Sequence, residues 1–206
     1  MGRIKTHKDM KPKKVLKKLK KGNKRFVKNL SLNRDLLKEA KSTSESQSPI
    51  AVVLSCLDSR SSAEVVFDQG IGDVFSARVA GNVVNDDILG SMEFACFLST
   101  AKVIVVLGHT NCGAVHGACD GAVLGNLTGL LKKIEVAVDS VKKPKNPNDR
   151  NSNNLEFVEK VTIENVKLTI ENIRKGSDIL SKMEKEGDIM IVGGIHNLVD
   201  GTIKYL

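Results

Sequence analysis

Three continuous apolar runs constrain the fold of this chain most strongly. They cover residues 50–54, 103–107 and 189–192; each is rich in Val or Ile, and each is bounded by polar residues. Strands that are buried on both faces have this pattern, because helices cover both sides of a parallel sheet. We therefore expect three central strands, with a fourth candidate strand over residues 74–79.

Segments with helical spacing alternate with these strands. Apolar residues recur at intervals of three and four residues over 86–98 and again over 155–183. This period is typical of helices that bury one face. Strands that alternate with helices predict an α/β fold, with a mostly parallel central β-sheet flanked by helices.

The N-terminal part of the chain differs in charge from the rest. Residues 1–25 hold twelve Lys and Arg and one acid, whereas the remaining 181 residues hold twenty bases and twenty-three acids. We expect residues 1–48 to form a basic N-terminal helical arm and linker, and residues 49–206 to form the globular domain. Within the arm, the pattern predicts one helix that ends at Gly22 and a second that covers residues 26–30.

The basic arm and the cysteine usage bear on partners and location. We interpret the arm as solvated or wrapped around a partner subunit, with attraction to nucleic acid or to an anionic membrane as the alternative. The rest of the chain has few aromatic residues to interleave with bases, so we expect no nucleic-acid partner.

No apolar run approaches the ~20 residues of a membrane span. Four cysteines without a C-x-x-C pair indicate a reducing compartment, so we expect a cytoplasmic protein with no membrane partner.

Residue types that bind metals follow the first two apolar runs directly. The first run leads into Cys56-Leu-Asp58-Ser-Arg60, and the second into a segment that contains His109 and Cys112. Sites in open α/β sheets form at the carboxyl ends of the strands, so these side chains should meet. Two thiolates and an imidazole suit zinc, and three protein ligands leave a fourth position for water, as in catalytic sites.

Each of these residues also has an ordinary interpretation. A single buried cysteine usually acts as a small apolar residue, and a single histidine is more often a hydrogen-bonded core residue. Asp58 and Arg60 could form an ion pair in a loop. The combination at two strand ends favours the metal site over these separate interpretations.

The paired motifs resemble those of the β-class carbonic anhydrases, in particular the bacterial-type members. Cys-x-Asp-Ser-Arg at 56–60 and His-x-x-Cys-Gly at 109–113 carry the resemblance. It extends to segments within 21–26, 67–82, 124–127 and 192–206, so most of the chain is similar to this family. The resemblance implies that residues 49–206 form a zinc-binding catalytic domain.

The resemblance also implies an activity and a ligand set. One Zn²⁺ per chain would be held by Cys56, His109 and Cys112, with water or Asp58 in the fourth position. The implied reaction is the reversible hydration of CO2 to bicarbonate and a proton, by attack of zinc-bound hydroxide. Because Asp58 can pair either with zinc or with Arg60, these two residues are expected to act as a pH-sensitive gate.

Two further residues are expected to bind the substrate. The side-chain amide of Gln69 and the backbone amide of Gly113 could each donate a hydrogen bond to bicarbonate. Family members place the site at a subunit interface, so a homodimer or homotetramer is expected.

Some members have a Trp and a Tyr at a second bicarbonate site where this chain has Val53 and His196. We interpret His196 as a core residue, with a proton relay as the alternative.

Two rival functions remain open from the sequence. A structural zinc site in a binding module would require a fourth permanent ligand, and the basic arm would then contact nucleic acid. A hydrolase of CS2 or COS would use the same zinc chemistry and would have nearly the same motifs.

Overall fold

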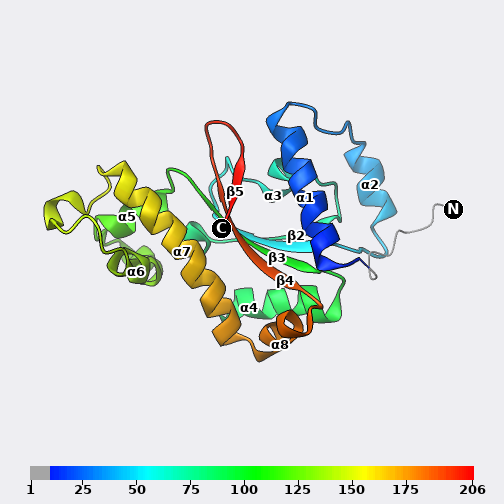
Figure 1. The fold of residues 1–206 in the computed structure, drawn as a ribbon. Coiled ribbons are helices and arrows are strands. Elements are labelled where there is room, and N and C mark those ends of the chain that lie inside the picture. Colours follow the sequence, from blue (N-terminus) through cyan, green and yellow to red (C-terminus); the bar gives the residue numbers. More distant parts are fainter. Residues whose placement is uncertain (1–9) are drawn as a thin grey trace.

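The computed structural model describes residues 10–206, so positions 1–9 of the predicted arm lie outside the described part of the chain. A five-stranded sheet forms the centre, and helices cover both of its faces (Figure 1). The elements are α1 (Pro12–Val27), α2 (Leu36–Ser42), β1 (Ala51–Ser55), α3 (Ala63–Val66), β2 (Val74–Arg78), η1 (Ala80–Asn82), α4 (Asp86–Glu93), η2 (Phe94–Leu98), β3 (Val103–His109), α5 (Gly113–Cys119), α6 (Gly125–Ser140), η3 (Pro147–Asp149), α7 (Leu155–Gly176), α8 (Asp178–Glu186), β4 (Met190–His196) and β5 (Ile203–Tyr205).

The strand order of the sheet is β2-β1-β3-β4-β5. The first four strands are parallel, and β5 pairs antiparallel with β4 at the edge. All four predicted strands are present, which confirms the predicted α/β class. Every residue of β1 and β3 is buried, as the continuous apolar runs indicate.

The two faces of the sheet are packed against different helices. Val52 and Leu54 of β1 lie in a core cluster with side chains of α4, α7 and α8. Ala51 and Val53 point to the opposite face, where Val15 and other side chains of α1 and α3 cover them. In Figure 1 these two groups of helices lie below and above the sheet. The division at residue 48 stays a prediction, and α1 packs directly on the sheet that it precedes.

The predicted end of the first helix at Gly22 is wrong. Helix α1 continues to Val27, and no second helix forms over residues 26–30. Gly22 is buried, and a Cβ built on it would lie 1.7 Å from the Phe67 carbonyl oxygen. The glycine therefore serves close packing between α1 and the α3 segment, which a sequence pattern cannot distinguish from a helix stop.

Two predicted helical segments are each divided in the structure. Residues 86–98 form α4 followed by a π-helical turn, η2. Residues 155–183 fall in α7 and α8, which are separated at Ser177. Ser177 has an extended backbone, and its hydroxyl accepts a hydrogen bond from the Leu180 amide, so it caps α8.

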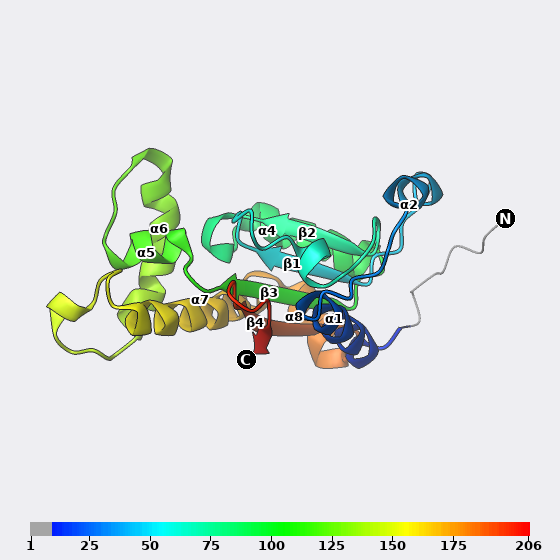
Figure 2. The same cartoon turned by 90° about the horizontal axis from the view of Figure 1, so that it is seen from above.

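Helices α5, α6 and the first half of α7 form a lobe beyond the carboxyl ends of the strands (Figure 2). A separate apolar cluster holds this lobe together, and it includes Cys56 and Cys112. The strand ends and the lobe thus bring the two predicted ligand segments to one place. Among the described residues, no helix is long and apolar enough to cross a membrane.

Candidate metal centre

Three predicted ligands converge where β1 and β3 end. Cys56 is the first residue after β1, His109 is the last residue of β3, and Cys112 is the N-cap of α5. One potential ligand atom from each lies within 4.8 Å of the others, and all three residues are buried. Parallel neighbouring strands place these residues together, as the sequence predicted.

The separation of the two sulfur atoms fits a tetrahedral metal ion. Cys56 Sγ and Cys112 Sγ are 3.8 Å apart. Tetrahedral zinc with Zn–S bonds of about 2.3 Å would hold two thiolates about 3.8 Å apart. Two sulfur donors and an imidazole also match the ligand preference of zinc. The residues present therefore fit the ion that the motif implies.

The orientation of His109 leaves one ring nitrogen free for a ligand role. Its Nδ1 lies 2.9 Å from the Thr110 carbonyl oxygen and is assigned as the donor to it. Its Nε2 is buried and has no hydrogen-bond partner within the described chain. A buried polar atom without a partner is costly unless something binds it. The lone pair of Nε2 is thus available for coordination, with the carbonyl bond fixing the tautomer.

The surroundings of Cys56 favour its thiolate. Hydrogen bonds from the Cys112 thiol and from the Gly81 amide lower the pKa of Cys56 against the opposing effect of burial, and the adjacent His109 ring acts in the same direction. The pKa of Cys112 is raised, because it donates to Cys56 and because it is buried. The first thiolate forms readily, and a bound cation would remove the penalty for the second.

Asp58 is turned toward Arg60 rather than toward the three ligands. Arg60 Nε donates to Asp58 Oδ1 at 2.9 Å and Nη2 donates to Oδ2 at 2.7 Å, a bidentate arrangement. The Arg60 backbone amide also donates to Oδ1. These bonds hold the pKa of Asp58 well below its usual value. Asp58 Oδ2 is 3.9 Å from His109 Nε2, so the carboxylate borders the site without joining the cluster.

The chain is similar in sequence to known proteins. The family described as carbonic anhydrase matches residues 51–203. A carbonic anhydrase of Mycolicibacterium smegmatis is 34% identical over 190 residues, which cover 91% of this chain and 90% of that protein. Carbonic anhydrase 2 of Mycobacterium tuberculosis is 34% identical over 188 residues, which cover 90% and 88%.

Solved structures agree with this relationship. The β-carbonic anhydrase CafA of Aspergillus fumigatus has a TM-score of 0.70 and 25% identity, with 89% of this chain and 86% of that chain covered. A tetrameric β-carbonic anhydrase of Sordaria macrospora has a TM-score of 0.67 and 23% identity, with 82% and 89% covered. The chain belongs to the β-class carbonic anhydrase family. Its membership and the names of its relatives support carbonic anhydrase activity.

In this β-carbonic anhydrase, one left-handed residue forms the turn between the two ligands of the second motif. Asn111 has a φ of +55°, in the left-handed region that Asn tolerates better than most residues. The turn lets the chain reverse between the end of β3 and the start of α5. It therefore brings Cys112 back toward His109.

The structure adds three residues that sequence reasoning did not connect with the site. Arg78, the last residue of β2, donates hydrogen bonds to backbone carbonyls of the Cys56 segment. Gly81 donates to Cys56 Sγ, and Asn165 of α7 donates to the Gly81 carbonyl. One signal was available in the sequence: Arg78 is the next-to-last residue of the predicted strand 74–79, near the end of the sheet where sites form.

The two predicted substrate-binding groups lie in different surroundings. Gln69 is buried, and its amide donates to the carbonyls of Phe67 and Asp68 at 2.6 and 2.9 Å, while its Oε1 has no partner within the described chain. Its described hydrogen bonds do not join it to the Cys-His-Cys cluster of the same chain. Gly113 directly follows Cys112 and begins α5, and open space surrounds the position of an added Cβ. The substrate roles of both residues stay predictions.

His196 lies in the core beside the site. It is 2% exposed and sits opposite His109 in the β3–β4 ladder. Its Nδ1 is 3.0 Å from the Ser61 hydroxyl, and burial lowers its pKa. These surroundings agree with the packed, hydrogen-bonded residue that the sequence favoured.

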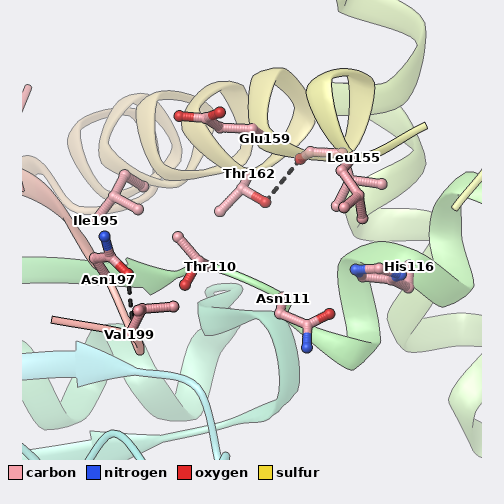
Figure 3. A pocket seen from close by; sticks show the side chains of 10 residues that line it. Thr110, Asn111, His116, Leu155, Glu159, Thr162, Ile195, Asn197 and Val199 are labelled. Atoms are coloured by element: carbon pink, nitrogen blue, oxygen red, sulfur yellow. Dashed lines mark hydrogen bonds between the residues drawn. The ribbon is translucent and has the colours of Figure 1, made fainter. Parts of the chain in front are cut away.

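A separate cavity of about 370 Å³ borders the turn between the two ligands of the second motif. Figure 3 shows polar side chains from this turn, from α5, from α7 and from the segment after β4 around it. None of the three ligands is among its lining residues, which are Thr110, Asn111, His116, Leu155, Val158, Glu159, Thr162, Ile195, Asn197 and Val199. The cavity is thus a neighbour of the metal centre rather than the metal centre itself.

Proposed function

We propose that the protein catalyses the zinc-dependent reversible hydration of CO2 to bicarbonate and a proton. The observation that carries this proposal is the Cys56, His109 and Cys112 cluster, whose sulfur separation of 3.8 Å fits tetrahedral zinc. Among residues 10–206 this cluster supplies three protein ligands, which leaves the fourth position for water. The reaction is inferred from the membership of the chain in the β-class carbonic anhydrase family.

Each residue of the site has a role in this proposal. Cys56, His109 and Cys112 hold one zinc ion per chain. The chemistry that zinc supplies when bound is a water pKa lowered to about 7, so that a nucleophile for CO2 exists near neutral pH. Asp58 is kept from the fourth position by its bidentate bond to Arg60, and the two residues act as a gate.

The proposal extends to substrate contacts and assembly. The Gly113 amide would donate a hydrogen bond to bicarbonate, and the Gln69 side chain would contact it through the unpaired Oε1, which can accept from the bicarbonate hydroxyl. Because the described hydrogen bonds of Gln69 go to its own segment, we infer that a neighbouring subunit presents it to bicarbonate. We infer a homodimer or homotetramer, and the Sordaria relative is described as tetrameric. We also propose a cytoplasmic location, since the four cysteines are free thiols.

The test of this function uses the purified wild-type chain. We expect about one zinc per chain by metal analysis, and CO2 hydration by stopped-flow measurement that is lost on chelation and recovered on adding Zn²⁺. One zinc per chain without hydration at any pH between about 6.5 and 9, a window around the lowered water pKa, would contradict the proposed activity.

Arg60→Gln tests the gate. The variant removes the fork that holds Asp58, so the carboxylate is free to compete for the fourth position. Hydrogen bonds to charged groups contribute about 1.5–3 kcal/mol, so we expect a tenfold to hundredfold loss of CO2 hydration at unchanged zinc content. The control is Arg174→Gln, which removes a similar bidentate pair with Glu184 away from the site. Equal activity in Arg60→Gln and wild type would show that Arg60 does not hold Asp58 off the metal.

A further inference from the structure

We propose that Arg78 is the positioning residue that fixes Cys56 for metal binding and thereby sets the zinc affinity of the site. The proposal rests on the zinc site proposed above. It assigns a role to a side chain that does not itself reach the ligand atoms.

Arg78 binds three consecutive backbone carbonyls. Its Nε donates to the Cys56 carbonyl at 3.3 Å, and its Nη2 donates to the carbonyls of Leu57 and Asp58 at 3.1 and 2.6 Å. A guanidinium is a rigid planar fork with five donors, so one side chain can fix several acceptors relative to one another. Lysine has no such fork. This one side chain therefore ties three consecutive residues, beginning with Cys56, to the end of β2.

The segment that follows Arg78 holds the sulfur of the same residue. The Gly81 amide donates to Cys56 Sγ at 3.4 Å. Gly81 has a φ of +67°, and Asn165 donates to its carbonyl at 2.8 Å from a position that is 3% exposed. The β2–η1 segment thus contacts both the backbone and the sulfur of Cys56, and α7 braces it.

Regular secondary structure holds the other two ligands. His109 belongs to β3 and is paired with β4. Cys112 caps α5, and its carbonyl accepts the His116 amide. Cys56 lies one residue beyond β1, where the sheet ladder has ended. Its placement therefore depends on side-chain support, and groups that orient metal ligands typically change metal affinity tenfold to hundredfold when removed.

The experiment measures the zinc dissociation constant by competition with a chromophoric chelator. We expect Arg78→Lys to weaken zinc binding by about tenfold to hundredfold, because the positive charge stays while the fork is lost. Arg174→Lys is the matched control, and its dissociation constant should stay within about twofold of wild type, since it lies outside the groups that orient the ligands. The thermal midpoint of the metal-free proteins is measured beside it, so that a loss of fold is seen separately.

A spectroscopic measurement reports on Cys56 directly. In the Co²⁺-substituted protein, the thiolate charge-transfer absorption per metal should fall in Arg78→Lys and stay unchanged in Arg174→Lys. Wild-type zinc affinity and wild-type absorption in Arg78→Lys would overturn the proposal. A wild-type protein that binds zinc without hydrating CO2 would contradict the proposed function and leave the role of Arg78 standing.

Discussion

Cys112→Ser is expected to remove zinc and nearly all CO2 hydration. Serine keeps the shape of the side chain, but its hydroxyl does not ionise as a thiol does and is a poor ligand for zinc. Without the metal the pKa of the water returns far above its zinc-bound value of about 7, so we expect the rate to fall by roughly three orders of magnitude or more. Metal analysis and stopped-flow CO2 hydration on the same preparation check this result.

The chain offers a matched control for this substitution. Cys119 is also buried and lies in the same apolar cluster as Cys112, but it is not part of the Cys-His-Cys group. Cys119→Ser should therefore keep its zinc and its activity, with at most a modest loss of stability. A Cys112→Ser protein that retained one zinc per chain and wild-type activity would show that Cys112 is not a ligand.

The strands and the ligand cluster could be predicted for the same physical reason. A strand that is buried on both faces must be apolar at every position, so β1 and β3 are visible as uninterrupted runs. Residue types that bind metals follow these two runs directly, so Cys56, His109 and Cys112 are conspicuous there. Parallel order then places both run ends at one edge of the sheet.

Arg78 and Gly81 could not be assigned by that reasoning. Their contacts with the site go to backbone carbonyls and to one sulfur atom, and they depend on the β1–β2 register that places Ser55 opposite Arg78. No spacing in the sequence encodes that register. Gln69 illustrates a related limit, because the sequence suggests a substrate contact while the described hydrogen bonds of its amide go to backbone carbonyls of its own segment.

Helix ends were less predictable than strands because tertiary contacts determine them. Helix α1 is rich in lysine. Its sequence does not distinguish a glycine that allows close packing from a glycine that ends a helix. Ser177 shows the opposite case. The apolar spacing continues from α7 into α8, although the helix is interrupted at Ser177, whose hydroxyl caps α8.

Gly22→Ala is expected to destabilise the fold although alanine is the better helix former. Alanine gains about 1 kcal/mol over glycine in a helix interior. Its Cβ would lie 1.7 Å from the Phe67 carbonyl oxygen and 2.7 Å from the carbonyl carbon, and backbone atoms cannot turn away as a side chain can. Helix α1 must then move off the sheet, which weakens the two bonds from the Asn23 amide to the carbonyls of Val66 and Gly201.

We expect the clash to outweigh the propensity, since overpacking costs about 1–3 kcal/mol and separating α1 also exposes apolar side chains at about 25 cal/mol per Å². A net loss of roughly 2–3 kcal/mol corresponds to a drop of about 5–10 °C in the thermal midpoint for a chain of this size.

Gly129→Ala in α6 is the control, because an added Cβ there meets no atom within 4 Å. That variant should be stabilised by up to about 1 kcal/mol. If both variants shifted the midpoint upward alike, α1 would not be packed against the Phe67 carbonyl in solution, and the arm would be free to take another position.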